Sequence, residues 1–309
     1  LRMKYRYLDL RRPPLQRNMI LRHKMAQEIR RFLSDEGFLE IETPYLVNST
    51  PEGARDFVVP SRMSPNQFYA LPQSPQTLKQ LLMGAGYDKY FQIVRCFRDE
   101  DLRADRQPEF TQIDCEMSFV EQEDVLEIFE RWAKHMFKHV MGIELTEPLR
   151  RMPWIEAMEK YGSDKPDLRF GMEFADLTDL AQGHGFAVFD DAEYVTGFAA
   201  TGCAGYTRKQ IDALCAEVEV QSGEKAYWFR YDENGEIVGG IAKFVAPIKD
   251  EAVKALGLVP GCFVGLTAGK KLAAQKTAGV FRNKLGAFCP NHMDKEKYKF
   301  CWIVDFPMY

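Results

Sequence analysis

The run FRDEDLRADRQPEFTQ, residues 97–112, decides the fold of the first half of the chain. It joins two stretches that favour β-structure, residues 90–98 and residues 110–119, while its own centre is charged and polar. A polar segment between two strand-forming stretches predicts an antiparallel pair of strands joined by a loop. We therefore expect a loop over residues 99–106, with Arg98 at the end of the first strand.

The second of these strands alternates with a period of two. Successive side chains of a strand point to opposite faces of a sheet. One face would carry Thr111, Ile113, Cys115, Met117 and Phe119, and the other Gln112, Asp114, Glu116 and Ser118. The second row holds two carboxylates next to a strand that ends in Arg98, so it is suited to form the floor of a polar binding site. A solvated sheet face is the alternative, and the pattern alone leaves both open.

N-terminal to this strand pair, the sequence predicts a long helix followed by a short strand. Residues 15–36 place apolar side chains three and four positions apart, and Gly37 provides the stop. The preceding Pro13-Pro14 pair breaks structure and is interpreted as the end of a linker. Residues 38–41 are expected to form the strand.

Two further helices are predicted in the first half of the chain. One should start with Ser74 as the N-cap and Pro75 at the first helical position. The other spans residues 123–140 and carries His135 and His139, four residues apart, a spacing that can bind zinc. No third ligand is evident, so we predict no metal site there.

The composition changes after about residue 165. Residues 174–288 are richer in Gly and Ala and alternate short helices with short strands, at 209–218, 251–256, 227–230 and 237–243. This pattern favours a separate α+β module. The last segment, residues 300–306, is again a strand and resembles those of the first half. We predict a sheet domain formed by residues 1–168 and 301–309, into which residues 169–300 are inserted.

Composition narrows the class of protein. The 309 residues are 46% hydrophobic and 28% charged, which is typical of a folded globular chain, and no apolar run approaches the length of a membrane helix. The seven cysteines include no CxxC pair, so neither a disulfide framework nor a cysteine zinc site is indicated. We expect a reduced cytoplasmic enzyme with no membrane partner. Its net charge is −4, yet the first thirty-one residues are strongly basic and could face a phosphate backbone. A solvated helix surface is the alternative, and the charges alone leave both open.

Three stretches together carry a family resemblance. They are FLEIETPYL at residues 38–46, PEGARDF at 51–57 followed by SPQTLKQ at 74–80, and the run at 97–112. They resemble motif 1, the amino-acid pocket and motif 2 of the class II aminoacyl-tRNA synthetases, most closely those of the bacterial aspartyl type. The resemblance extends to residues 5–13 and 300–309. It implies an α+β fold, with an antiparallel sheet flanked by helices and a smaller inserted α+β domain.

The resemblance also implies an activity, that of an ATP-dependent aspartate–tRNA ligase. Such an enzyme joins aspartate to the α-phosphate of ATP and then transfers the acyl group to the 3′ end of tRNA(Asp). The implied partners are L-aspartate, ATP with Mg²⁺, and tRNA(Asp). The implied assembly is a homodimer formed through helix 15–36 and the strand that ends at Pro44.

The resemblance assigns roles to individual residues. Arg98 is the implied catalytic residue, because a guanidinium fork suits a phosphate oxygen and a carboxylate at once. ATP would be bound by Arg98, Asp99, Glu100, Gln107 and Phe110. Aspartate would be bound by Glu52, Ser74, Gln76, Lys79, Arg98 and Asp114, with Glu52 on a loop hinged at Gly53. Arg103 and Arg106 are candidates for tRNA contact.

Some parts of the family pattern are expected to lie outside this chain. They are the N-terminal anticodon-binding domain, motif 3 and the ligands of Mg²⁺, so no metal site is expected within these residues. We accordingly expect the chain to be a fragment that is inactive alone. The alternative is a non-catalytic relative that keeps the scaffold as a tRNA-binding or dimerisation module.

Overall fold

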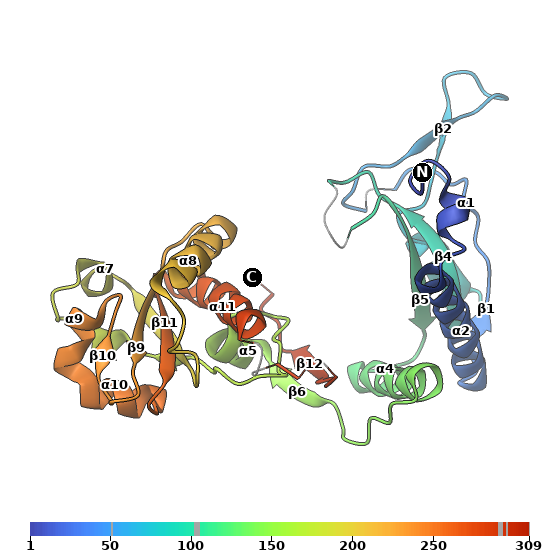
Figure 1. The fold of residues 1–309 in the computed structure, drawn as a ribbon. Helices are drawn as coiled ribbons and strands as arrows, with labels where there is room; N and C mark the ends of the chain where they lie inside the picture. Colours follow the sequence, from blue (N-terminus) through green and yellow to red (C-terminus); the bar gives the residue numbers. More distant parts are fainter. Residues whose placement is uncertain (51, 102–105, 290–292, 295, 309) are drawn as a thin grey trace. The chain divides into compact units, whose positions relative to one another are not determined.

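The computed structural model describes residues 1–309 except 51, 102–105, 290–292, 295 and 309. The chain divides into two compact units, Leu1–Glu147 and Pro148–Tyr309, and each has its own hydrophobic core. Figure 1 shows the elements of both units. Each unit contains a sheet and helices that pack on it, so the predicted α+β class is confirmed.

The first unit is built on a three-stranded sheet. Its strands lie in the order β1 (Leu39–Glu40), β4 (Lys89–Phe97) and β5 (Glu109–Met117). β4 and β5 pair antiparallel, as the run at 97–112 predicts. β1 runs parallel to β4, because the chain crosses over through a hairpin and a helix before it returns to the sheet.

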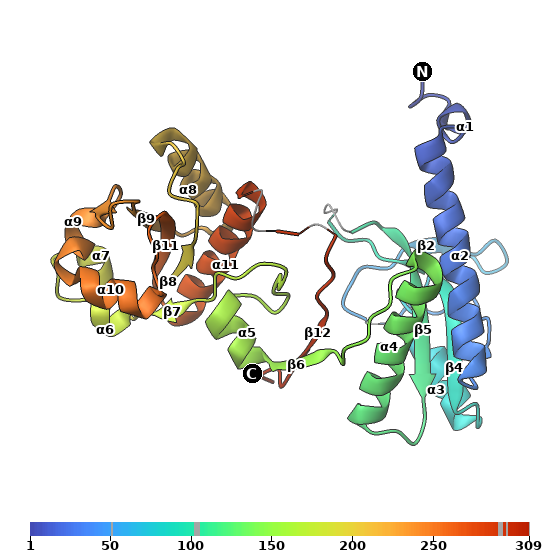
Figure 2. The same cartoon turned by 60° about the horizontal axis from the view of Figure 1, so that its bottom comes forward.

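Two helices cover one face of this sheet. They are α2 (Pro13–Asp35) and α4 (Gln122–Met136), and Figure 2 shows both lying along β4 and β5. Phe32 and Ile128 from the two helices pack in one cluster with Phe91 of β4. Ile113 and Cys115 of β5 pack against the same cluster. The apolar row of β5 therefore faces the core, which leaves the row with Gln112, Asp114 and Glu116 on the opposite face.

The start of α2 differs from the prediction. Pro13 and Pro14 are the first residues of the helix and do not end a linker. Proline is well suited to this position because its ring presets the helical φ and the first N–H groups of a helix have no internal partner. Only the C-terminal half of the helix contributes to the core, through Ile29, Phe32 and Leu33. The apolar side chains of its N-terminal half, Met19, Ile20, Leu21 and Met25, are exposed.

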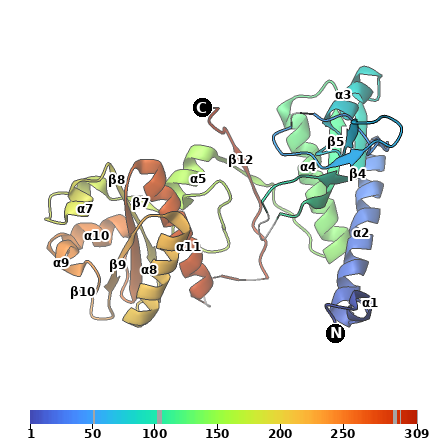
Figure 3. The same cartoon turned by 90° about the horizontal axis from the view of Figure 1, so that it is seen from above.

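The other elements of the first unit surround the polar face or extend the helices. They are α1 (Arg6–Asp9), the antiparallel pair β2 (Val58–Pro60) and β3 (Phe68–Ala70), α3 (Gln76–Gly84), and a π-helical turn that extends α4 (Phe137–Met141). Figure 3 shows α3 beside the β4–β5 pair, near the beginning of β4. The predicted cap of α3 is wrong: Pro75 occupies the N-cap position, and the hydroxyl of Ser74 binds Glu52 instead.

The second unit is built on a five-stranded antiparallel sheet. In spatial order its strands are β10 (Ile237–Val238), β9 (Ala226–Tyr231), β11 (Cys262–Gly269), β8 (Tyr194–Ala200) and β7 (Ala175–Asp176). One face packs against α8 (Arg208–Ser222) and α11 (Lys271–Phe288). The other is covered by α6 (Thr178–Ala181), α7 (Ala187–Asp190), α9 (Ala242–Val245), a 3₁₀ turn (Ala246–Ile248) and α10 (Lys249–Leu256).

Most of the short elements predicted in this region are confirmed. The helices at 209–218 and 251–256 and the strand at 227–230 lie within α8, α10 and β9. The strand predicted at 237–243 is wrong after residue 238, where the chain turns at Gly239 and Gly240 into α9. Gly240 has a φ of +48°, and a Cβ there would lie 1.8 Å from the carbonyl oxygen of Trp228. This close approach permits only glycine and ends the strand.

A two-stranded parallel pair completes the second unit. β6 (Arg150–Pro153) pairs with β12 (Cys301–Val304), and α5 (Trp154–Tyr161) follows β6 directly. The strand predicted at 300–306 is thus present, and both members of the pair lie in the unit Pro148–Tyr309. The division into domains 1–168, 169–300 and 301–309 stays a prediction. No helix in the described part of the chain is long and apolar enough to cross a membrane.

A buried arginine fixes the loop between α5 and β7. The guanidinium of Arg282, on α11, donates to the carbonyl oxygens of Asp167 and Phe170 at 2.8 and 2.9 Å, and also to those of Gly171 and Met172. Its Cζ lies 4.2 Å from the ring centroid of Phe170. Burial lowers the pKa of Arg282 to about 10, so the side chain remains a cation at neutral pH.

Candidate active site

The polar face of the β4–β5 pair is a continuous hydrogen-bonded surface. The register sets Gln92 opposite Asp114 and Tyr90 opposite Glu116. The hydroxyl of Tyr90 and that of Thr43 donate to the side-chain oxygen of Gln92 at 2.9 and 3.0 Å. Burial and the nearby charge of Asp114 raise the pKa of Tyr90, which keeps its hydroxyl protonated. The burial of Tyr90 and Gln92 argues against a solvated sheet face. We call this face the floor, and its role in binding stays a prediction.

Lys79 lies over this floor from α3. Its Nζ is 2.8 Å from Asp114 Oδ1 and 3.1 Å from Glu116 Oε2, and its side chain is 10% exposed. Burial alone would lower the pKa of Lys79, but hydrogen bonds and charges from Asp114 and Glu116 outweigh burial and raise it. Lys79 is therefore held as a cation. The other carboxylate oxygen of Asp114 is buried and has no hydrogen-bond partner within the described residues.

Arg98 and Phe110 form the second part of the site, at the open end of the strand pair. The backbone N–H of Arg98 donates to Pro108 O at 2.8 Å, which continues the pairing just beyond β4 and β5. The guanidinium Cζ of Arg98 lies 5.1 Å from the ring centroid of Phe110, a cation–π contact. Both side chains are partly exposed, so a ligand can reach them.

The loop that follows Arg98 carries the other predicted ATP-binding residues. The backbones of Asp99 and Arg55 pair in an isolated antiparallel β-bridge. Their side chains form an ion pair, with Arg55 Nε 3.7 Å from the Asp99 carboxylate. Glu100 and Arg106 form an exposed ion pair at 3.2 Å. Gln107 is exposed. The predicted tRNA contact Arg103 lies outside the described residues.

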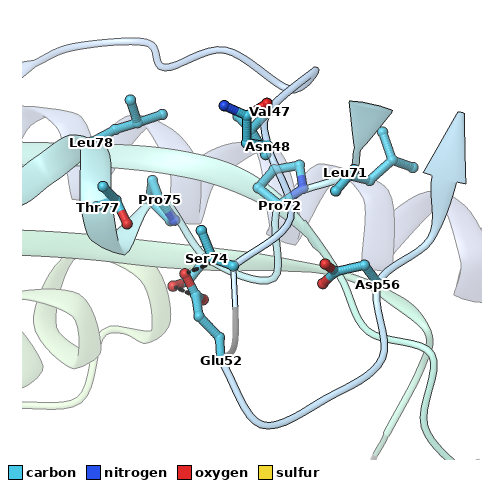
Figure 4. A pocket seen from close by; sticks show the side chains of 12 residues that line it. Val47, Asn48, Glu52, Asp56, Leu71, Pro72, Ser74, Pro75, Thr77 and Leu78 are labelled. Carbon is cyan, nitrogen blue, oxygen red and sulfur yellow. Dashed lines mark hydrogen bonds between the residues drawn. The ribbon is translucent and has the colours of Figure 1, made fainter. Parts of the chain in front are cut away.

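Glu52 is held by two hydroxyl groups. Thr50 Oγ1 donates to one carboxylate oxygen at 3.1 Å, and Ser74 Oγ donates to the other at 2.9 Å (Figure 4). Gly53 follows with a φ of +95°, which favours glycine. A small, partly open pocket of about 40 Å³ lies beside Glu52, and Asp56, Ser74 and Thr77 also line it.

β4 also contributes a buried thiol, that of Cys96. Cys96, on β4, donates to Gln112 Oε1 at 3.1 Å. The pKa of the Cys96 thiol is raised to about 11, mainly by burial. The negative charges of Asp114 and Glu52 also raise this pKa, while the positive charges of Arg98 and Lys79 oppose the shift. The alternation of β4 could have identified Cys96, because it lies two residues before Arg98, which directly follows this strand.

Several residues of the site were not predicted. Tyr90 and Gln92 support the floor, and Gln73 and Asp56 tie down the loop that carries Glu52. Gln76, which is also predicted to bind aspartate, is the first residue of α3.

The histidine pair on α4 and the following turn lies elsewhere in the unit. His135 Nε2 is 3.0 Å from Glu28 Oε2, and the His135 ring lies against that of His139 at a centroid distance of 4.2 Å. The described residues contain no group of three or more side chains arranged to hold a metal ion. The contact between His135 and Glu28 therefore joins α4 to α2.

The site combines a buried lysine, a guanidinium beside an aromatic ring, and a loop carboxylate. In a comparison with known families, the model described as "tRNA synthetases class II (D, K and N)" matches residues 1–309. The chain belongs to this family.

Individual relatives are named as ligases. The chain is 57% identical over 316 residues to the "Aspartate--tRNA ligase" of Parabacteroides distasonis and 56% identical over 313 residues to that of Bacteroides thetaiotaomicron. In both cases all of this chain and 53% of the relative are covered. It is 49% identical to the "Aspartate--tRNA(Asp/Asn) ligase" of Symbiobacterium thermophilum, with 99% of this chain and 52% of the relative covered. The chain thus spans about half the length of these curated relatives.

Proposed function

We propose that this chain is the front part of the catalytic domain of an ATP-dependent aspartate–tRNA ligase, together with its inserted domain. The observation that carries the proposal is the buried cation of Lys79, held by Asp114 and Glu116 in the same unit as the guanidinium of Arg98 beside Phe110 and the carboxylate of Glu52 bound by Ser74. A substrate amino acid with a carboxylate side chain presents one ammonium and two carboxylates. These cations and carboxylates complement those charges.

The aspartate pocket is assigned to the part of the floor near α3. Lys79 binds the side-chain carboxylate of the substrate, which joins or replaces Glu116 as its partner. Glu52, Ser74, Gln76 and Asp114 bind the α-ammonium, and the free oxygen of Asp114 is one acceptor for it. An asparagine side chain in this place would leave the buried cation without a full counter-charge, which disfavours its binding.

The ATP site is assigned to the open end of the hairpin. The adenine stacks on Phe110, and Arg98, Asp99, Glu100 and Gln107 bind the nucleotide. An oxygen of the substrate α-carboxylate bonds to the α-phosphorus, the bond from that phosphorus to the pyrophosphate oxygen breaks, and pyrophosphate leaves with the electron pair. Arg98 neutralises the charge that develops on the α-phosphate. Mg²⁺, when bound, would supply further charge neutralisation, and we assign its ligands to residues outside this chain.

The remaining partners are assigned to the surface of the first unit. Arg103 and Arg106 contact the acceptor end of tRNA(Asp). A second copy of the protein covers the exposed apolar half of α2 and the strand that follows it, where Leu39, Tyr45 and Leu46 are also exposed. Such an enzyme acts in the cytoplasm, where tRNA is charged.

The test is ATP–pyrophosphate exchange by the full-length protein with each of the twenty amino acids. Exchange driven by aspartate alone is the expected result. Exchange driven by asparagine or lysine would overturn the substrate assignment, and no exchange with any amino acid would support a non-catalytic module. That alternative is not favoured by the relatives, which are named as ligases.

A further inference from the structure

A buried glutamine joins the loop of Glu52 to the segment that leads into α3. Gln73 is 2% exposed and precedes Ser74 directly. Its side-chain oxygen accepts from Ala54 N at 3.1 Å, and its Nε2 donates to Ala54 O at 2.8 Å. Nε2 also donates to Asp56 Oδ1. Both the oxygen and the nitrogen of this side-chain amide are therefore hydrogen-bonded to the same loop.

Asp56 and the segment that carries Gln73 are themselves held in place by further hydrogen bonds. Asp56 Oδ2 accepts a hydrogen bond from Ser49 Oγ at 2.5 Å, so both carboxylate oxygens of Asp56 are used. The segment that carries Gln73 is attached to the sheet, because Phe97 N donates to Pro72 O at 2.9 Å. A rigid connection therefore runs from the end of β4 to the peptide of Ala54.

Glu52 lies just beyond the fixed peptide. Only Gly53 separates it from Ala54, and Gly53 is exposed with a φ of +95°. The carboxylate of Glu52 reaches Ser74, the neighbour of Gln73, at 2.9 Å. The two adjacent residues thus have different roles, since Gln73 holds the base of the loop and Ser74 holds the carboxylate. A glycine between a fixed peptide and Glu52 confines any movement of the loop to a short segment.

We propose that Gln73 is a positioning residue for aspartate binding, which acts through Glu52 by fixing the loop at Ala54 and Asp56. This inference rests on the proposed function, in which Glu52 binds the α-ammonium of aspartate. Gln73 does not touch the substrate. Its removal therefore alters how well Glu52 is placed and leaves the ATP-binding residues at the end of the hairpin unchanged.

The experiment measures ATP–pyrophosphate exchange by the full-length protein, with aspartate and ATP varied separately. Gln73→Met keeps the length of the side chain and removes its polar atoms. We expect the KM for aspartate to rise about tenfold or more, because an imprecisely placed binding group loses much of its effect. The KM for ATP should change less than about twofold. Gln80→Met, at an exposed glutamine of α3, is the matched control and should leave both constants unchanged.

Two further variants separate positioning from a general loss of stability. Gln73→Glu places an oxygen against both Ala54 O and the Asp56 carboxylate. Adding Asp56→Asn restores a donor–acceptor pair at residue 56 but leaves the repulsion at Ala54 O, so the double variant should recover part of the aspartate affinity lost in Gln73→Glu. In a Glu52→Gln background, Gln73→Met should add little to the KM for aspartate, since both changes disable the same group. If Gln73→Met does not fold, the comparison of Gln73→Glu with the Gln73→Glu, Asp56→Asn double variant tests the proposal.

The outcomes distinguish this inference from the function on which it rests. A wild-type protein that does not exchange aspartate overturns the proposed function and this inference with it. A wild-type protein that exchanges aspartate, with a KM unchanged in Gln73→Met or Gln73→Glu, overturns only the role of Gln73. The role of Gln73 would also be overturned if the effects of Gln73→Met and Glu52→Gln on the KM for aspartate added fully in the double variant.

Discussion

Lys79 on α3 and Asp114 on β5 form a hydrogen-bonded ion pair at 2.8 Å, although 35 residues separate them in the sequence. Both side chains are 10% exposed. A buried lysine keeps its charge only when carboxylates surround it, and here Asp114 and Glu116 do so. Under the proposed function, this cation would bind the side-chain carboxylate of the substrate.

Arg98→Ala should reduce the rate of aspartyl-adenylate formation by about 10²–10³-fold, because the charge that develops on the α-phosphate loses a preorganised donor. The rate is measured in single-turnover experiments with the full-length protein. Arg95→Ala is the control: Arg95 lies on β4, three residues before Arg98, in an exposed ion pair with Glu109, so its loss should change the rate less than about twofold. Similar rates in the two variants would refute the role of Arg98.

The contact between α2 and α4 should weaken in acid. Burial raises the pKa of Glu28, but hydrogen bonds and charges from His135 and Arg31 outweigh burial and lower it. A carboxyl whose folded-state pKa is lowered adds stability above its ordinary pKa, here 4.5, and this stability is lost as the pH falls through the folded value.

Glu28→Gln tests this prediction by urea denaturation at several pH values. The wild-type protein should be the more stable by about 1 kcal/mol or less at pH 7, and this difference should shrink toward pH 3. A difference that stayed constant across this range would show that the charge of Glu28 does not stabilise the fold.

Arg282→Met should destabilise the second unit by about 2 kcal/mol or more, because the carbonyl oxygens of residues 167, 170, 171 and 172 would lose a buried donor. Urea denaturation measures the loss. The control is Arg208→Met, because the side chain of Arg208 on α8 is 85% exposed and its ion pair should contribute little. Equal stability of the two variants would contradict the anchoring role.

The sequence predicted the parts of the fold that show a local pattern. β5 alternates because one face meets the helices and the other forms the floor, and its faces were predicted correctly. β8 and β11 were not predicted, because helices cover both faces of their sheet and their side chains show no alternation. α11 was also missed: it is buried on several sides, and its buried residues include Gln275, Thr277 and Arg282, so no apolar stripe marks it.

The candidate site was predicted through the family motifs more than through local pattern. Lys79 would otherwise be an ordinary helix lysine, since nothing in the sequence around it indicates burial. Its partners come from a strand far away in the chain, and such pairings depend on the register of β4 with β5. Gln73 shows the same limit: its contacts with Ala54 and Asp56 depend on where two loops meet.

The most direct test of the account is the discrimination between aspartate and asparagine by the full-length protein and its Lys79→Met variant, measured as the ratio of kcat/KM in ATP–pyrophosphate exchange. Lys254→Met, on an exposed residue of α10, is the control. We predict that Lys79→Met weakens aspartate binding and lowers the ratio by about 10²-fold or more, while the KM for ATP stays nearly normal. An unchanged aspartate KM together with an unchanged ratio would contradict the assignment of this floor as the aspartate pocket.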